Sequence, residues 1–134
     1  KDLKFIEKLS PEMCGIGPFV PHKDTKFKNE NHGDVSLVLM LLSIIRLLKP
    51  NILLPATTAL GTVDPLGREK GILHGANVVM PNLSPVKHRK DYSLYDNKIC
   101  TGDEAAQCIG CLADRMKKIG YEIVTDRGDY KADI

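Results

Sequence analysis

The sequence has 134 residues, 43% of them hydrophobic and 27% charged, which is the size and composition of one folded domain and excludes a disordered chain. Its 19 Lys and Arg residues nearly balance its 17 Asp and Glu residues, and a net charge of +2 excludes the strongly basic surface of a nucleic-acid or membrane-surface protein. The longest apolar run, Val35 to Leu48, is shorter than the about 20 residues that cross a bilayer, and no signal peptide follows Lys1, so we expect a cytoplasmic protein.

The first 50 residues predict a helix, a short strand and a second helix. Apolar residues at helical spacing indicate a helix over Lys1 to Leu9, which Pro11 ends. Met13 to Val20 is predicted to be a short strand that enters a long, polar and basic loop, and loops of this length are often functional. Asp34 is a suitable N-cap for a helix over Val35 to Leu48, whose nearly uniform apolar character predicts packing on several sides.

The rest of the chain continues this alternation. Short apolar runs predict buried strands over Ile52 to Leu54 and Asn77 to Met80. Helices are predicted over Asp64 to His74 and over Asp103 to Lys118, and a last strand is predicted over Tyr121 to Thr125. Alternating strands and helices indicate parallel βα units.

We therefore expect one α/β domain over residues 1–134. Its strand–helix units are predicted at about 11–50, 51–75 and 76–119, with the C-terminal strand at about 121–125.

Three clustered cysteines, Cys100, Cys108 and Cys111, are the first chemical signal in the sequence. Thiolates are soft ligands for iron–sulfur clusters and zinc, and a CxxC turn can place two sulfurs on one metal while Cys100 closes the site. The spacing does not separate zinc from iron–sulfur. Three reduced structural thiols, some facing the core, are the alternative interpretation.

Side chains at the predicted strand ends are the second signal, because the carboxyl ends of the strands build the active site of a βα barrel. Met13, Thr57, Thr58 and Met80 stand at such ends. Paired hydroxyls can bind an anion or a carboxylate, and methionines form an adaptable apolar wall. Taken without any family resemblance, these residues favour a plainer interpretation, in which the threonines cap a turn and the methionines fill the core.

Long segments of the sequence resemble one enzyme family. PEMCGIGPFVPH, LLPATTALGT, PLGREKGILHGANVVMPNLSP and YSLYDNKIC followed by CIGC closely resemble the radical-SAM maturases of [FeFe]-hydrogenase, the HydE family. The sequence resembles biotin synthase and the methylornithine synthase of the pyrrolysine pathway more distantly. The resemblance implies that this chain is the C-terminal portion of a TIM-type (βα) barrel, about three βα units plus a C-terminal segment.

The resemblance also implies a chemistry for the whole family enzyme. An N-terminal CxxxCxxC loop binds a catalytic [4Fe–4S] cluster that cleaves S-adenosylmethionine, and the resulting radical acts inside the barrel on an organometallic iron substrate. This sequence contains no CxxxCxxC. We therefore expect a fragment that is inactive alone, has no catalytic residue of its own and contributes part of the substrate cavity of the parent enzyme.

Matching positions imply roles for individual residues. Cys100, Cys108 and Cys111 match an auxiliary iron–sulfur site, [2Fe–2S] or [4Fe–4S]. The other matching residues are expected to line the cavity: Thr57, Thr58 and Met80 as an anion-binding wall, Met13 as a further wall position, and Tyr92, Leu94 and Tyr95 as a segment that closes the cavity near the cofactor.

Two other functions stay open at this point. One is a stand-alone module that binds an iron–sulfur cluster or an anion, and the other is a structural domain held together by zinc. A partial barrel exposes unpaired strand edges, so we expect it to associate with the missing N-terminal half or with a second copy. We expect neither nucleic acid nor a membrane as a partner.

Overall fold

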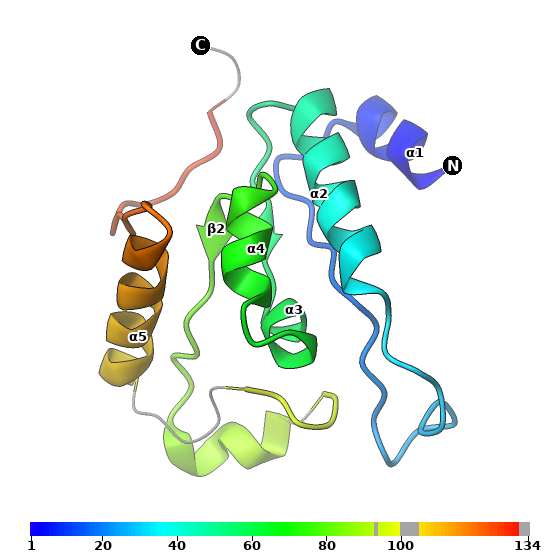
Figure 1. The fold of residues 1–134 in the computed structure, drawn as a ribbon, viewed down its shortest axis with the longest axis vertical. Helices are drawn as coiled ribbons and strands as arrows, with labels where there is room; N and C mark the ends of the chain where they lie inside the picture. Colours follow the sequence, from blue (N-terminus) through cyan, green and yellow to red (C-terminus); the bar gives the residue numbers. More distant parts are fainter. Residues whose placement is uncertain (93, 100–104, 132–134) are drawn as a thin grey trace.

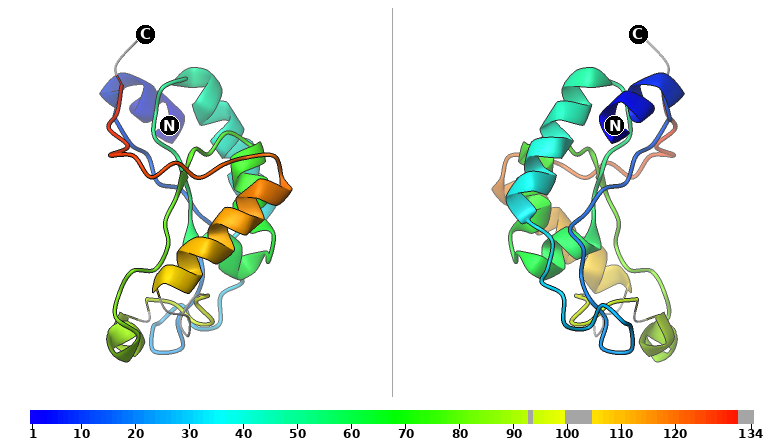
Figure 2. Two further views of the ribbon diagram at one scale, coloured as in Figure 1. Left: turned by 90° about the vertical axis from the view of Figure 1, so that its left-hand side faces the viewer. Right: turned by 90° about the vertical axis from the view of Figure 1, so that its right-hand side faces the viewer.

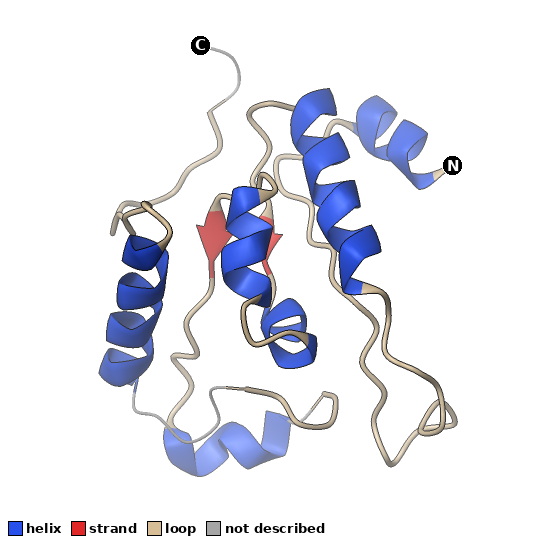
Figure 3. Cartoon of the chain, in the orientation of Figure 1, coloured by secondary structure: helices blue, strands red, loops and turns tan. Residues whose placement is uncertain are grey.

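The computed structural model describes residues 1–92, 94–99 and 105–131 (Figure 1). The helices are α1 (Asp2–Leu9), α2 (Val35–Leu48), α3 (Thr58–Val63), α4 (Gly67–Leu73), the 3₁₀ helix η1 (Val86–Tyr92) and α5 (Ala105–Lys118), and the strands are β1 (Pro55–Ala56) and β2 (Val78–Val79). Figure 3 shows how short the strands are beside the helices. Within the described ranges, no helix is both long and apolar enough to cross a membrane.

The strands form a small parallel sheet. Pro55 pairs with Val78 and Ala56 with Val79. An isolated parallel bridge joins Met13 to Leu53, with hydrogen bonds of 3.0 Å from Cys14 N to the Leu53 carbonyl and 2.9 Å from Leu53 N to that of Glu12. The predicted α/β class with parallel units is therefore confirmed. Three parallel segments are too few to close a barrel, so the barrel itself stays a prediction.

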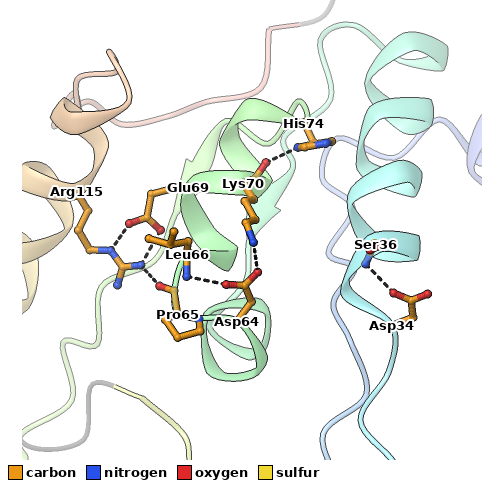
Figure 4. Close-up of polar contacts among 9 residues, drawn as sticks. All are labelled: Asp34, Ser36, Asp64, Pro65, Leu66, Glu69, Lys70, His74 and Arg115. Atoms are coloured by element: carbon orange, nitrogen blue, oxygen red, sulfur yellow. Dashed lines mark hydrogen bonds and ion pairs between the residues drawn. The ribbon is translucent and has the colours of Figure 1, made fainter.

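Helix α2 has the predicted bounds because Asp34 caps it. The Asp34 carboxylate accepts hydrogen bonds from Ser36 N at 2.7 Å (Figure 4) and from Leu37 N at 3.4 Å, which satisfies two N–H groups of the first turn. Its core face carries Leu42 and Ile45, which are fully buried. The opposite face, with Leu37, Met40 and Leu47, is exposed, so packing on several sides is not seen among the described residues.

The helix predicted over Asp64 to His74 is found as α4 but begins three residues later than predicted, and α3, which ends just before Asp64, was not predicted. Helix α3 ends where Asp64 N donates to the Leu60 carbonyl at 3.0 Å. The Asp64 carboxylate then accepts from Leu66 N at 2.9 Å, and Pro65 has no N–H to continue a helix. The chain therefore turns before α4 begins at Gly67.

The strand predicted over Tyr121 to Thr125 is not formed. Gly120, with φ +82°, ends the α5 segment, and Tyr121 N donates back to the Met116 carbonyl at 3.0 Å. Only Ile123 of this stretch packs against the core, while Val124 is 78% exposed. The alternating apolar pattern therefore does not correspond to a buried sheet face. The strand predicted from Met13 to Val20 is likewise reduced to the single bridge at Met13.

The core lies between the sheet and helices that cover one of its faces (Figures 1 and 2). Its members come from α2, α4 and α5 and from alternate residues of the central strand segment: Leu42, Ile45, Ile72, Met116, Ile52, Leu54 and Ala56. The loops that leave the carboxyl ends of the parallel segments gather in the lower part of Figure 1.

Candidate functional site

A small cavity lies at the carboxyl ends of β1 and β2. Its volume is about 160 Å³, and its lining comes from the start of α3, from α4, from the chain after β2 and from residues 98 and 99: Thr58, Arg68, Met80, Pro81, Asn82, Lys98 and Ile99. This is the side of a parallel sheet on which βα proteins place their active sites.

The end of β1 places Thr58 at this cavity. The Thr57 hydroxyl accepts a hydrogen bond from Leu60 N at 3.3 Å and so caps α3. Helix α3 therefore starts directly after the strand, with Thr58 as its first residue. Gly61, one turn later, allows Ile99 and Arg68 to pack closely against α3. A Cβ at this position would stand 2.9 Å from Ile99 Cδ1 and 3.0 Å from Arg68 Nε.

Two cationic side chains border the cavity. Arg68 is a buried residue, 2% exposed, and Lys98 is partly buried, with Nζ 3.4 Å from the Tyr92 carbonyl. The nearest acid in sequence, Glu69, turns to α5, where its carboxylate accepts from Arg115 at 2.5 and 2.6 Å (Figure 4). Among the described lining residues, the charged side chains are the cations Arg68 and Lys98, which suits a small anion or carboxylate.

The predicted cavity residues divide between two places. Thr58 and Met80 share the small cavity, whereas Met13 lines a different cavity of about 510 Å³ beside Leu53 and Val79, near the strand starts. Thr57 lines neither cavity, and its cap on α3 is the turn-capping role that the sequence also allowed.

The residues predicted to close the cavity, Tyr92, Leu94 and Tyr95, differ in exposure and do not line it. Tyr92 and Leu94 are 61% and 78% exposed, Tyr95 is partly buried, and none of the three lines either cavity. Lys98 and Ile99 of the same segment do line the small cavity.

The predicted metal ligands are described only in part. Cys108 is buried and its Sγ lies 3.4 Å from Asn82 N, while Cys111 is exposed one turn further along α5. Residues three apart on a helix are surface neighbours, but one of these two thiols is buried and the other is exposed. Cys100 lies outside the described residues, and those described contain no group of three His, Cys, Asp or Glu side chains that could hold a metal.

The fourth cysteine stands apart from this cluster. Cys14 packs against the core, and burial raises the pKa of its thiol, which disfavours the thiolate form that binds metals.

Five lining residues of the small cavity were not among the predicted site residues: Arg68, Pro81, Asn82, Lys98 and Ile99. Arg68 could have been found, because it is a charged residue on a helix face that packs inward. Lys98 and Ile99 carry no comparable signal, since a long polar connection separates them from the strand ends.

Comparison with known proteins identifies a relative. No family model matches the chain. Over 130 residues, 97% of its length, the chain is 42% identical to the [FeFe] hydrogenase maturase subunit HydE of Thermotoga maritima. The chain is a relative of HydE. The resemblance predicted from the sequence is thus confirmed, and the chain spans 37% of the length of this HydE. Because the similarity covers nearly the whole chain, the small cavity lies inside the HydE-like region.

Proposed function

We propose that the chain supplies the substrate-cavity portion of a HydE-like radical S-adenosylmethionine enzyme that acts in the maturation of [FeFe]-hydrogenase. The similarity to HydE, 42% identity over 97% of the chain, carries this proposal. The geometry supports it, because a polar, positively lined cavity stands at the carboxyl ends of parallel strands, where barrel enzymes bind their substrates.

The chain forms the C-terminal portion of a (βα) barrel in this proposal, with strand–helix units at about 11–50, 51–75 and 76–119 of a single domain over residues 1–134. Its 134 residues hold no CxxxCxxC motif. The catalytic [4Fe–4S] cluster and the main part of the S-adenosylmethionine site then belong to the remainder of the intact protein, which acts in the cytoplasm.

Each wall of the small cavity has a separate task. Arg68 and Lys98 attract the anionic part of a small or organometallic substrate, and the Thr58 hydroxyl orients it by a hydrogen bond. Met80 and Ile99 exclude water, which a carbon-centred radical requires to avoid side reactions. The other predicted residues border the central cavity of the complete barrel in this proposal: Met13, Thr57, Tyr92, Leu94 and Tyr95.

Cys100, Cys108 and Cys111 hold an auxiliary iron–sulfur cluster, [2Fe–2S] or [4Fe–4S], in this proposal. Thiolate donors suit iron, and two of the three thiols stand one turn apart on α5. A bound cluster would supply a redox-active or ligand-binding iron close to the cavity. Zinc in the same thiols is the rival metal, and it would make the site a structural one.

The free edges of the sheet need a partner. Among the described residues, β2 pairs only with β1, and unpaired edges attract further strands. The rest of the barrel covers these edges in the intact protein. A second copy covers them in the isolated chain, so sedimentation should show a dimer or larger species, and a monodisperse monomer would contradict this pairing.

The test of the function is radical chemistry in the intact protein. Iron-loaded protein with S-adenosylmethionine and dithionite should release 5′-deoxyadenosine and should support hydrogenase maturation in a reconstituted assay. Thr58→Val should lower maturation at least tenfold by removing the orienting hydroxyl, whereas Thr125→Val, at an exposed position that lines neither cavity, should not.

Two results would oppose the proposal. Iron-loaded intact protein that releases no 5′-deoxyadenosine would favour a module that only binds a cluster or an anion. A Thr58→Val protein with full maturation activity would remove the cavity from the mechanism.

A further inference from the structure

Residues 94–99, here called the strap, connect two distant parts of the fold. At one end the strap reaches the loop of residues 19–33, and at the other it reaches α3 beside the small cavity. Lys98 and Ile99, which line that cavity, belong to the strap. The position of these two cavity residues therefore depends on what holds the strap.

Asp96 makes the contacts to the loop. Its Oδ2 accepts a hydrogen bond from Lys23 N at 2.8 Å, and its own N–H donates to the Pro21 carbonyl at 3.1 Å. Its Oδ1 stands 4.0 Å from His22 Nε2. The two partners are 73 residues apart in the sequence, so these contacts are tertiary and not part of a local turn.

The loop of residues 19–33 is a suitable anchor because it is ordered by its own contacts. Gly33 N donates to the Phe19 carbonyl at 2.8 Å, which closes the loop at its base. The rings of Phe19 and Phe27 meet edge to face, with 6.0 Å between their centroids. The Thr25 hydroxyl donates to the His22 carbonyl at 2.9 Å.

The strap turns from this anchor directly to the cavity. Asn97 has φ +56°, a left-handed conformation that asparagine tolerates better than most residues. The next residues are Lys98 at the cavity and Ile99, whose N–H stands 3.4 Å from Thr62 Oγ1 and whose Cδ1 fills the space left by Gly61.

We propose that Asp96 is a positioning residue: it fixes the strap to the loop of residues 19–33 and thereby holds Lys98 and Ile99 against the cavity. The anchoring follows from the contacts of Asp96 alone, whereas its consequence for ligand affinity rests on the proposed function. Asp96 does not itself line the cavity.

The experiment compares Asp96→Ala with Asp24→Ala in the intact protein. Asp24→Ala removes the same charge beside the same histidine, because Asp24 Oδ2 lies 3.8 Å from His22 Nδ1. The Asp24 side chain is 74% exposed and makes no hydrogen bond to the strap. Hydrogen exchange followed by mass spectrometry measures the amide exchange rates of the strap. A sulfate titration followed by the Met80 methyl signal measures the affinity of the cavity for an anion.

Asp96→Ala should speed amide exchange in the strap and at Lys23 at least tenfold and weaken sulfate binding at least threefold, with the overall fold kept in a thermal melt. Asp24→Ala should change neither. Unchanged strap exchange in Asp96→Ala would overturn the proposal. If that variant does not fold, Asp96→Glu, which displaces the carboxylate by one methylene, is judged by the same two criteria.

The two proposals fail in different ways. Wild-type protein that binds no sulfate, while Asp96→Ala still loses strap protection, would refute the anion site and leave the anchor standing. Sulfate binding that is equal in wild type and Asp96→Ala would refute the positioning role and leave the anion site standing.

Discussion

At the residue scale, the two thiols of α5 allow a direct test of the proposed iron–sulfur site. Cys108→Ser combined with Cys111→Ser should abolish the visible absorption and the iron of that cluster in anaerobically purified protein, because two soft ligands are lost. The far-ultraviolet dichroism should stay, since a redox-active cluster is not needed to form the sheet. Cys14→Ser, outside the cluster of thiols, should keep the iron.

Two outcomes would contradict this assignment. Stoichiometric zinc in place of iron would identify a structural metal. Loss of the whole fold in the double variant would do the same, because structural metal sites contribute directly to folding.

Gly61 and Gly67 differ in the space that is available for an added Cβ atom. A Cβ on Gly67 would stand 2.2 Å from the Leu60 carbonyl oxygen, a backbone atom that cannot move alone. A Cβ on Gly61 would stand 2.9 Å from Ile99 Cδ1, the free end of a side chain. We expect Gly67→Ala to lower the free energy of unfolding by roughly 2–3 kcal/mol.

Gly61→Ala should change that free energy little, because alanine favours a helix by about 1 kcal/mol over glycine. It should instead shift the Met80 methyl signal by moving Ile99. Urea unfolding separates the two variants, and equal losses of stability would contradict the packing around Leu60.

At the element scale, an ion pair between Glu69 and Arg115 joins α4 to α5. Burial raises the pKa of Glu69, but hydrogen bonds from Arg115 and from its own backbone, with the charges of Arg115 and Arg68, outweigh burial and lower its pKa below 4.5. Arg115 also donates to the Pro65 carbonyl (Figure 4). A lowered pKa means that the carboxylate adds stability at neutral pH, and that this stability is lost as the pH falls through the pKa of the folded state.

Glu69→Gln should therefore destabilise the protein by about 2 kcal/mol at pH 7. The difference from wild type should shrink as the pH is lowered from 7 to below the lowered pKa of the wild-type carboxyl, where that group is protonated. Urea unfolding at the two pH values measures this, with Glu30→Gln in the exposed loop as the control. A difference that does not change with pH would show that the charge of Glu69 is not what holds α5.

At the scale of the whole molecule, the sequence predicted elements well where local chemistry decides them. The bounds of α2 follow from Asp34 as its cap, and the end of the α5 segment follows from Gly120. The predictions failed at one local turn and at one stretch whose burial the sequence does not reveal. The break between α3 and α4 depends on how Asp64 and Pro65 act together, and the unformed strand at Tyr121 to Thr125 lacked a buried face.

The same division applies to the site. Thr58 and Met80 were predicted because they match family positions at the ends of predicted strands, and the sheet brings them to one cavity. Arg68 and Lys98 were not predicted, because the first was counted as a helix residue and the second lies on the strap, whose position depends on Asp96. Pairings across 73 residues leave no periodic pattern in a sequence.

The central claim is that Thr58, Met80, Arg68 and Lys98 enclose one site for an anion. The chain carries four methionines, Met13, Met40, Met80 and Met116, whose methyl groups report separate places in the fold. A sulfate titration of methyl-labelled intact protein should shift Met80 in a saturable way. It should leave the buried Met116 and the outer-face Met40 unchanged, and Lys98→Met should weaken the response at least threefold. An unmoved Met80 signal, or equal shifts at all four methyl groups, would contradict the claim.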